Sequence, residues 1–247
     1  MRWLFWCSAA LLLAGCGGTR TGDPFAYDRT APLAIRGEGV YATAPWATIR
    51  ALSFRGLGRT RVEAYLIVPT TAGRRPAVLY LHGSGGSRRD LLYEAALLAR
   101  RGAVTMTITY PSAAPSYRPL VVDARRALDV LAARGDVDPK RLGVVGFSLG
   151  GQLAAILAGD DPRVRAAGII GGRGNAVTLY WIRRAHAQLF FQAGTEDQVV
   201  PHPQLLALMA AAPGRPLTRW YAIGHELTKP LDADQAAFQA RALGLTG

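Results

Sequence analysis

Short apolar runs alternate along the chain with segments whose apolar residues recur every three or four positions, and this order constrains the fold most. Uninterrupted apolar runs predict interior parallel strands covered on both faces, at residues 77–81, 142–145 and 188–191. Helical spacing occurs over residues 120–131 and 205–210. Strand and helix in repeated succession predict an α/β domain with a mostly parallel sheet and helices on both faces.

A second strand pattern differs from these runs. Apolar and polar side chains alternate over residues 60–68, up to Pro69. Such alternation is typical of a strand with one solvent-exposed face, so we expect this strand near a sheet edge.

The composition suits one globular domain without a nucleic-acid surface. The 247 residues are 50% hydrophobic and 19% charged, which excludes a disordered or fibrous chain. The net charge of +12 comes from arginines dispersed in pairs along the chain rather than gathered in one stretch. Because phosphate binding uses clustered basic residues, we predict no nucleic-acid partner.

The N-terminus has the pattern of an export signal. Arg2 is followed by the apolar residues 3–14, a run too short to span a bilayer, and then by Gly15 and Cys16. This ending resembles the lipobox of bacterial lipoproteins, in which cleavage precedes a cysteine that receives a lipid. An ordinary signal peptide or a short helix with an incidental cysteine are the alternatives.

The lipoprotein interpretation divides the chain into three parts. Residues 1–15 are the signal peptide, residues 16–45 the lipidated N-terminus and a flexible tether, and residues 46–247 the folded domain. The protein is then expected in the bacterial cell envelope, anchored to a membrane through Cys16, with its domain facing the periplasm or the cell exterior.

A G-x-S-x-G sequence at residues 146–150 follows the predicted strand 142–145 and precedes a helix-forming stretch, residues 152–158. This strand, turn and helix context is that of a nucleophile elbow. The turn is so tight that its flanking positions require glycine. Ser148 is therefore the candidate nucleophile, and the N–H of Leu149 is a candidate oxyanion donor at the start of the helix.

A glycine-rich loop, His82-Gly83-Ser84-Gly85-Gly86, follows the predicted strand 77–81. Its glycines would let the backbone approach a bound acyl group, so we assign the N–H of Ser84 as the second oxyanion donor. Ordinary turn chemistry after a buried strand is the alternative. His82 is expected to orient this loop rather than to transfer protons.

A serine nucleophile needs a base, and the base needs a carboxylate that fixes its tautomer. Asp197 lies in an acidic loop after the predicted strand 188–191 and is the candidate acid; the adjacent Glu196 is its competitor. His225 follows the last predicted strand and is the candidate base. No metal-ligand spacing and no phosphate-binding loop motif occurs in the sequence, so we predict no metal and no cofactor.

With these motifs in this order, residues 46 to 245 resemble the α/β-hydrolase superfamily, in particular its compact dienelactone-hydrolase-like and prolyl-oligopeptidase-like serine hydrolases. The resemblance implies an eight-stranded, mostly parallel sheet without a large cap domain. Dienelactone hydrolases proper use a cysteine where this chain has Ser148, which puts the dienelactone substrate in doubt. The oligopeptidases carry a propeller domain for which this chain is too short.

The resemblance further implies hydrolysis of a carboxylic ester through an acyl-enzyme, with a small or water-soluble ester as substrate. The same triad could serve a peptidase, a thioesterase or an acyltransferase, and a non-catalytic binding lipoprotein is a further alternative. The segment between the strands near residues 166–170 and 188 is too short for a large cap. Its residues from Arg173 to Arg184 form either a short basic rim that meets the substrate or a solvated helix. An open site of this kind favours a short acyl group.

Overall fold

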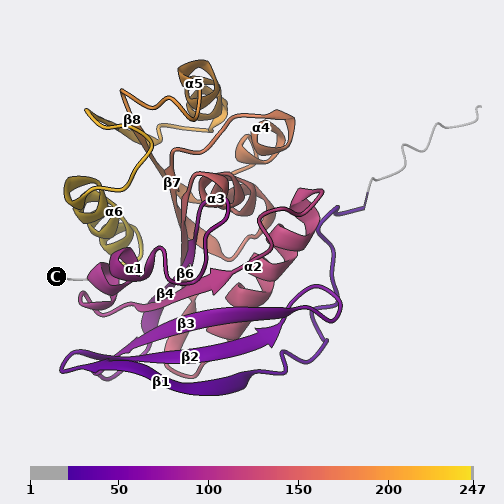
Figure 1. Ribbon diagram of the computed structural model, residues 1–247, viewed down its shortest axis with the longest axis vertical. Coiled ribbons are helices and arrows are strands. Elements are labelled where there is room, and N and C mark those ends of the chain that lie inside the picture. The colour runs from indigo at the N-terminus through magenta and orange to yellow at the C-terminus, as the bar shows by residue number, and fades with distance from the viewer. Residues whose placement is uncertain (1–21, 246–247) are drawn as a thin grey trace, which may run out of the picture.

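A single sheet of nine strands forms the centre of the computed structural model, which describes residues 22–245 (Figure 1). The spatial order of the strands is β1-β2-β3-β5-β4-β6-β7-β8-β9. Their bounds are β1 Arg36–Ala44, β2 Ala47–Arg55, β3 Arg61–Pro69, β4 Arg75–Leu81, β5 Val104–Thr109, β6 Val137–Phe147, β7 Val164–Ile170, β8 Gln188–Gly194 and β9 Leu217–Tyr221. The α/β-hydrolase fold and its mostly parallel sheet are thus confirmed, with nine strands where the resemblance implied eight.

The six strands from β5 to β9 in this order are parallel, whereas β1, β2 and β3 are antiparallel to one another and β3 is antiparallel to β5. In a parallel sheet, all strand carboxyl ends lie at one edge, where the following loops meet. The loops after β4, β6, β8 and β9, which carry the predicted site residues, therefore converge.

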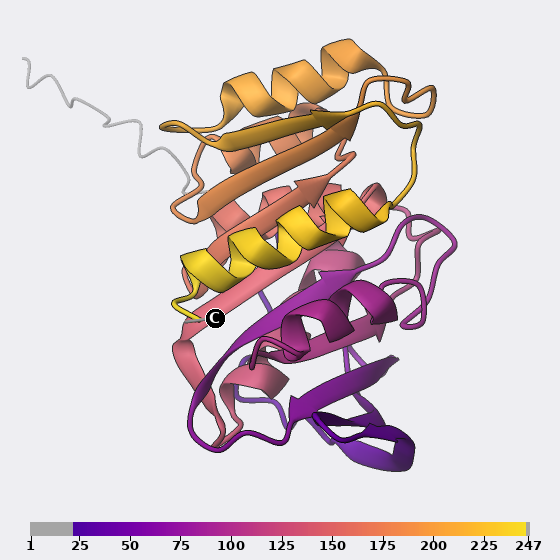
Figure 2. The same cartoon turned by 90° about the vertical axis from the view of Figure 1, so that its left-hand side faces the viewer.

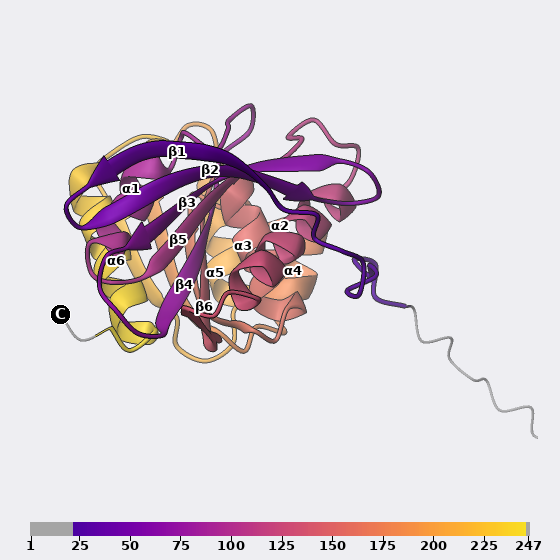
Figure 3. The ribbon, with the colours of Figure 1, turned by 90° about the horizontal axis from the view of Figure 1, so that it is seen from below.

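Helices cover both faces of the sheet (Figure 3). Helices α1 and α6 pack together on one face, and α2, α3, α4 and α5 form a contiguous row on the other. In Figure 2, α6 crosses in front of the strands. The helices span α1 Leu92–Ala99, α2 Tyr117–Ala132, α3 Leu149–Asp160, α4 Ala176–Ile182, α5 His202–Ala211 and α6 Lys229–Ala242. No helix within residues 22–245 is long and apolar enough to cross a membrane.

The folded domain begins upstream of residue 46, the boundary expected from the sequence. Strand β1 pairs with β2 as the outermost hairpin of the same sheet. Its side chains are almost all exposed, and its register shifts twice, between Gly37 and Gly39 and between Val40 and Ala42. A strand with neither burial nor regular alternation carries no apolar pattern, and for that reason the sequence did not reveal it. The predicted cleavage and lipidation site, Cys16, lies outside the described residues.

Strand β3 was expected near a sheet edge but lies between β2 and β5. Arg61 and Glu63 at its start are exposed, whereas the residues from Ala64 to Ile67 are all buried. The edge position is therefore wrong, because the β1–β2 hairpin extends the sheet beyond β3 and helix α1 packs against it.

Candidate active site

Ser148 occupies a strained turn between β6 and α3. Its φ of 57° lies in the left-handed region, which a residue with a Cβ rarely adopts. A Cβ on Gly146 would overlap the backbone of Gly150, and a Cβ on Gly150 would overlap the carbonyl of Leu81 at the end of β4. Both glycines are required by close backbone approach, so the geometry of a nucleophile elbow is present at Ser148.

Asp197 lies in the loop after β8, where its side chain is buried. Its Oδ1 accepts hydrogen bonds from the N–H of Val199 at 2.8 Å and of Val200 at 2.9 Å, and its Oδ2 lies 2.7 Å from Nδ1 of His225. Burial alone would raise the pKa of this carboxyl, but the hydrogen bonds from Val200, His225 and Val199 outweigh it and hold the pKa below its usual value. Asp197 is therefore ionised at neutral pH.

The competing acid, Glu196, points away from this site. Its side chain is exposed, and only Asp197 of the two contacts His225. The backbone N–H of Glu196 instead bonds the carbonyl of Ile223 at 3.0 Å, which ties the acidic loop to the loop that carries His225. The geometry favours Asp197 over Glu196 as the partner of the histidine.

His225 lies between β9 and α6, with its ring partly covered by Phe147 at a centroid distance of 4.8 Å. Because Nδ1 bonds an ionised carboxylate, Nδ1 carries a proton and Nε2 is available to accept one. Nε2 is buried and has no hydrogen-bond partner within residues 22–245. A Cβ on Gly171, whose φ is +55°, would approach Cε1 of His225 to 3.0 Å, so the chain requires glycine there to leave room for the ring.

The structure brings Asp197 and His225 into direct contact, and the ring of His225 packs against Phe147, the residue before Ser148. Among the described residues, no hydrogen bond joins the Ser148 hydroxyl to His225. Catalytic hydrogen bonds are often long or misaligned before substrate binds. Rotation of the serine side chain about its single χ1 bond is the adjustment that a Ser148–His225 contact would need.

The loop after β4 lies against the elbow. A Cβ on Gly83 would come within 3.5 Å of the Ser148 Cβ. The N–H of Leu149 is the first of α3 and has no intrahelical acceptor, and the N–H of Ser84 donates to no backbone or side-chain acceptor in the described part of the chain. Two unoccupied N–H groups are thus present in the segments that flank Ser148, where the sequence predicted an oxyanion hole.

His82 holds this loop in place. Its Nδ1 lies 2.6 Å from the carbonyl oxygen of Gly83, which can only accept, so Nδ1 is the protonated nitrogen. Nε2 accepts from the N–H of Tyr110 at 3.4 Å, and the two rings stack at 4.0 Å. Burial lowers the pKa of His82. The His82 side chain is neutral and both of its ring nitrogens form hydrogen bonds, which agrees with a role in orienting the loop.

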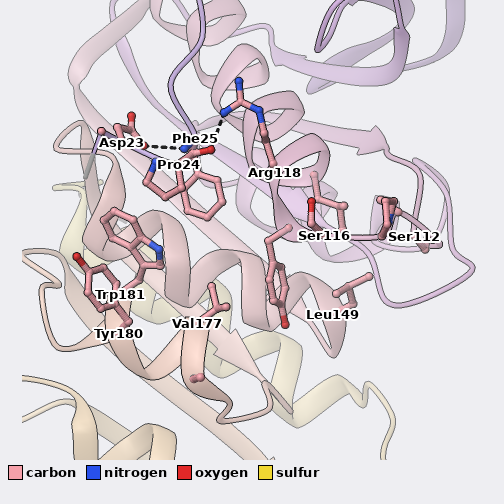
Figure 4. Close-up of a pocket in the computed structure, with 16 residues that line it drawn as sticks. Asp23, Pro24, Phe25, Ser112, Ser116, Arg118, Leu149, Val177, Tyr180 and Trp181 are labelled. Atoms are coloured by element: carbon pink, nitrogen blue, oxygen red, sulfur yellow. Dashed lines mark hydrogen bonds between the residues drawn. The ribbon is translucent and has the colours of Figure 1, made fainter. Parts of the chain in front are cut away.

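A cavity of about 1040 Å³ opens beside Leu149 (Figure 4). It lies between α2, α4 and the segment that precedes β1, and sequence reasoning did not find it. Tyr117 in its lining is fixed by a polar cluster: its hydroxyl donates to Oε1 of Gln152 and accepts from Nδ2 of Asn175, at 2.8 Å. Asn175 also caps α4, so one residue both begins the helix and positions the cavity wall.

The family profile described as "Dienelactone hydrolase family" matches residues 99–214, a range that includes the elbow, the part of the cavity lining on α2 and α4, and Asp197. Just under half of the chain is therefore similar to the dienelactone hydrolase family. The crystal structure of acetyl xylan esterase 1 from a Thermoanaerobacterium species has the same fold, with a TM-score of 0.72 at 19% identity over 89% of this chain and 90% of that chain. Other solved structures with this fold include a further acetyl xylan esterase, from a Paenibacillus species, and a puromycin-hydrolyzing peptidase of Mycobacterium tuberculosis.

Sequence relatives cover only part of this chain. An uncharacterized protein of Mycobacterium tuberculosis is 29% identical over 177 residues, which are 62% of this chain and 63% of that protein. Acyl-coenzyme A thioesterase 1 of Rattus norvegicus is 31% identical over 123 residues, 47% of this chain and 28% of that enzyme. The match therefore spans less than two thirds of the length of either relative.

The basic segment from Arg173 to Arg184 forms α4 and its flanks. Nη2 of Arg173 donates to the carbonyl of Val199 at 3.3 Å, and Arg184 lies over the Tyr180 ring at 3.7 Å while donating to its carbonyl. These two arginines make contacts within the protein, and α4 presents Tyr180 and Trp181 to the cavity. Within residues 22–245, no group of three or more His, Cys, Asp or Glu side chains could hold a metal ion.

Proposed function

We propose that the protein is a serine hydrolase that cleaves a carboxylic ester through an acyl-enzyme, with Ser148 as nucleophile, His225 as base and Asp197 as acid. The observation that carries this proposal is the 2.7 Å contact between Asp197 and His225 beside a serine held at a positive φ. The match of residues 99–214 to the dienelactone hydrolase family and the esterases among the neighbours in fold support the same class of chemistry.

In the proposed reaction, the Ser148 hydroxyl attacks the ester carbonyl while Nε2 of His225 takes its proton. Collapse of the tetrahedral intermediate breaks the bond to the alcohol, which leaves with the proton that His225 returns. Water, deprotonated by His225, then attacks the acyl-enzyme and releases the carboxylic acid. Asp197 remains ionised throughout and stabilises the imidazolium.

The developing oxyanion needs donors that are already in position. The N–H groups of Leu149 and Ser84 supply them in our proposal, because neither has an acceptor in the described chain and both flank Ser148. Removing one such donor in other hydrolases costs about 10²–10³ in kcat. The backbone, rather than a side chain, performs this function here.

A thioester is the second candidate substrate class. The identity to a rat acyl-coenzyme A thioesterase, which extends over 47% of this chain, favours it over peptide bonds or acyl transfer. The same attack on a carbonyl would apply, with a thiolate in place of the alcohol as leaving group.

We further propose that residues 1–15 are removed and that Cys16 carries a lipid, which would hold the enzyme in the bacterial cell envelope with its domain facing the periplasm or the cell exterior. A short apolar run that ends in Leu13-Ala14-Gly15-Cys16 supports this proposal. Cys16→Ser protein should move from the membrane fraction to the soluble fraction; retention on the membrane would contradict lipidation.

The hydrolase proposal is tested by covalent labelling with a fluorophosphonate, followed by mass spectrometry of the labelled peptide. We expect one adduct on Ser148 in the folded protein, and we expect Ser148→Ala to lose both the adduct and ester turnover. Ser87→Ala, which removes a serine that bonds Asp90 on the surface, is the matched control and should behave as wild type. Folded protein without an adduct on Ser148 would overturn the proposal. Where the adduct forms, a comparison of the turnover of esters with that of thioesters identifies the leaving group.

A further inference from the structure

The cavity beside Leu149 has a lining that is mainly apolar. It begins at Leu149, the residue after the proposed nucleophile, and its far side is formed by the N-terminal segment and α4 (Figure 4). The side chains that make it apolar are Pro24, Phe25, Leu149, Val177, Tyr180 and Trp181. Its volume of about 1040 Å³ is at the upper end for a small-molecule site, far more than an acetyl group requires.

The far wall is part of the fold rather than a loose extension. We call residues 23–27 the N-terminal strap. Arg118 of α2 donates to the carbonyls of Pro24 at 2.5 Å and Ala26 at 2.8 Å, and Arg125 pairs with Asp23 at 3.0 Å. These contacts hold the strap against α2, so the cavity keeps a defined end.

Two aromatic rings form that end. Phe25 is buried, and its ring lies 5.6 Å from that of Trp181 on α4. Because these rings come from segments far apart in the sequence, the wall depends on the docked strap. In the view of Figure 4, they lie on the opposite side of the cavity from Leu149.

The charged groups of the lining are already partnered. Asp23 pairs with Arg125, and Arg118 is engaged by the strap carbonyls. A charged occupant would have to compete with these contacts, whereas an apolar chain would displace water from an apolar surface. The lining therefore favours a hydrocarbon chain.

We propose that this cavity binds the acyl chain of the ester and that Phe25 and Trp181 limit the length of that chain. The preferred acyl chain is longer than the short acyl group expected from the sequence. The inference rests on the proposed function, because the cavity is linked to the reaction by Leu149, the lining residue that follows Ser148 in the chain. It replaces the expectation of a short acyl group, which the sequence favoured only because no cap was visible. The N-terminal strap forms the part of the cavity wall that a cap domain would otherwise form.

The expected size of the selectivity follows from burial of methylene groups. Each buried methylene contributes about 0.8 kcal/mol, or about fourfold in kcat/KM, until the chain meets the far wall. Acetate and octanoate differ by six methylenes, so burial of all six would give about 4000-fold. We therefore expect kcat/KM to rise along the p-nitrophenyl esters from acetate through butyrate to octanoate, by about 100-fold to about 4000-fold in total according to how many methylenes are buried.

The test is the ratio of kcat/KM for octanoate to that for acetate in wild type and in Val177→Trp. Val177 lines the cavity from the exposed side of α4, so a larger side chain there fills the cavity without disturbing the core. We expect the ratio to fall by about tenfold or more. Leu206→Trp, which introduces the same residue at an exposed position on α5 outside the cavity, should leave the ratio at the wild-type value.

The far wall is tested by Phe25→Ala, which should move the preferred acyl chain to a greater length. Because this change could also loosen the strap, binding of octanoate to Ser148→Ala protein by calorimetry provides a second measurement. We expect octanoate to bind more tightly than butyrate, and Val177→Trp in the same background to weaken octanoate binding by about tenfold.

A flat chain-length profile in a protein that hydrolyses acetate through Ser148 would overturn this inference and leave the hydrolase proposal intact. Equal ratios for Val177→Trp and Leu206→Trp would overturn it as well. Failure of the proposed function has a different signature, namely no turnover of any ester and no adduct on Ser148. Octanoate binding would in that case still report whether the cavity accepts an acyl chain.

Discussion

The loop after β8 and the seam between α1 and α6 both bury carboxyl groups, with opposite results. In the loop, Asp197 accepts two backbone N–H groups and contacts His225, and its pKa lies below the usual value. In the seam, Glu94 of α1 and Asp232 of α6 each have a buried oxygen without a hydrogen-bond partner among the described residues. Burial raises the pKa of Glu94 to about 7 and that of Asp232 to about 6.

This comparison shows that hydrogen-bond donors, rather than burial, decide whether a buried carboxyl group is charged. Desolvation opposes ionisation at all three positions, and only the loop after β8 supplies enough hydrogen bonds to overcome it. A carboxylate that must hold a histidine in one tautomer has to remain ionised, which Asp197 does. Glu94 and Asp232 lack such hydrogen-bond donors, so they lower the stability of the folded state at the pH values at which they ionise.

The largest effect is expected from removing the charge of Asp197. In Asp197→Asn, the amide no longer stabilises a protonated imidazole, so we expect kcat for the preferred ester to fall by about 10⁴ with the fold retained. Steady-state kinetics and circular dichroism measure the two quantities. Glu196→Gln removes the neighbouring exposed charge and should keep the wild-type kcat; a loss in Glu196→Gln but not in Asp197→Asn would move the acid to Glu196.

The second prediction removes the nearest side-chain donor from a buried carboxyl group and leaves its backbone donor in place. Asp161, at the end of α3, is buried with its pKa lowered, mainly by Arg163, which bonds it at 2.6 Å against the opposing effect of burial. Arg163→Met should raise the pKa of Asp161 and lower the free energy of unfolding at pH 7 by about 3 kcal/mol. Denaturant titration checks this, with Arg165→Met at a nearby exposed position as control. Equal stability of the two variants would contradict the role of the donor.

The smallest effect is expected on the free energy of unfolding when Glu94, in the seam between α1 and α6, is replaced. The folded state of Glu94 binds a proton more tightly than the unfolded state, so the free energy of unfolding falls as pH rises from about 4.5 to about 7. Glu94→Gln should therefore stabilise the protein at pH 8 by about 1–2 kcal/mol, less than the full shift would give because the side chain is partly exposed. We expect no gain at pH 4, where Glu94 is already protonated.

Thermal unfolding at both pH values tests this prediction, and a gain of a few degrees is expected at pH 8 for a domain of this size. Glu63→Gln removes a carboxylate from the exposed start of β3 and controls for the change in net charge. A gain that is the same at pH 4 and pH 8 would show that packing, rather than ionisation, is responsible.

The proposed nucleophile could be located from the sequence because its requirements are local. Gly146 and Gly150 are needed where the backbone of β6 turns into α3, and the apolar run before them and the helix after them are visible in the residues. His225 and Asp197 were found by their places after predicted strands. Their direct contact follows from the parallel sheet, which brings those loops to one edge.

Other parts of the site left no local signal. Gln152, Asn175 and Tyr117 lie on α3, before α4 and on α2, and each is an ordinary polar residue until the fold places them in hydrogen-bonding contact. The strap was expected to be a flexible tether because its composition is that of a linker. Its partners, Arg118 and Arg125, are remote in sequence, so docking could not be inferred from residues 16–45.

The sequence by itself determined the alternation of strands and helices, the elbow at Ser148 and the identity of the acid and base candidates, because periodicity and glycine requirements act between neighbouring residues. Only the tertiary structure decided how many strands the sheet has, which carboxyl groups find donors, and where the acyl cavity ends. Those properties depend on contacts between segments separated by tens of residues, and the free energy of such contacts is set by which groups meet when the chain is folded.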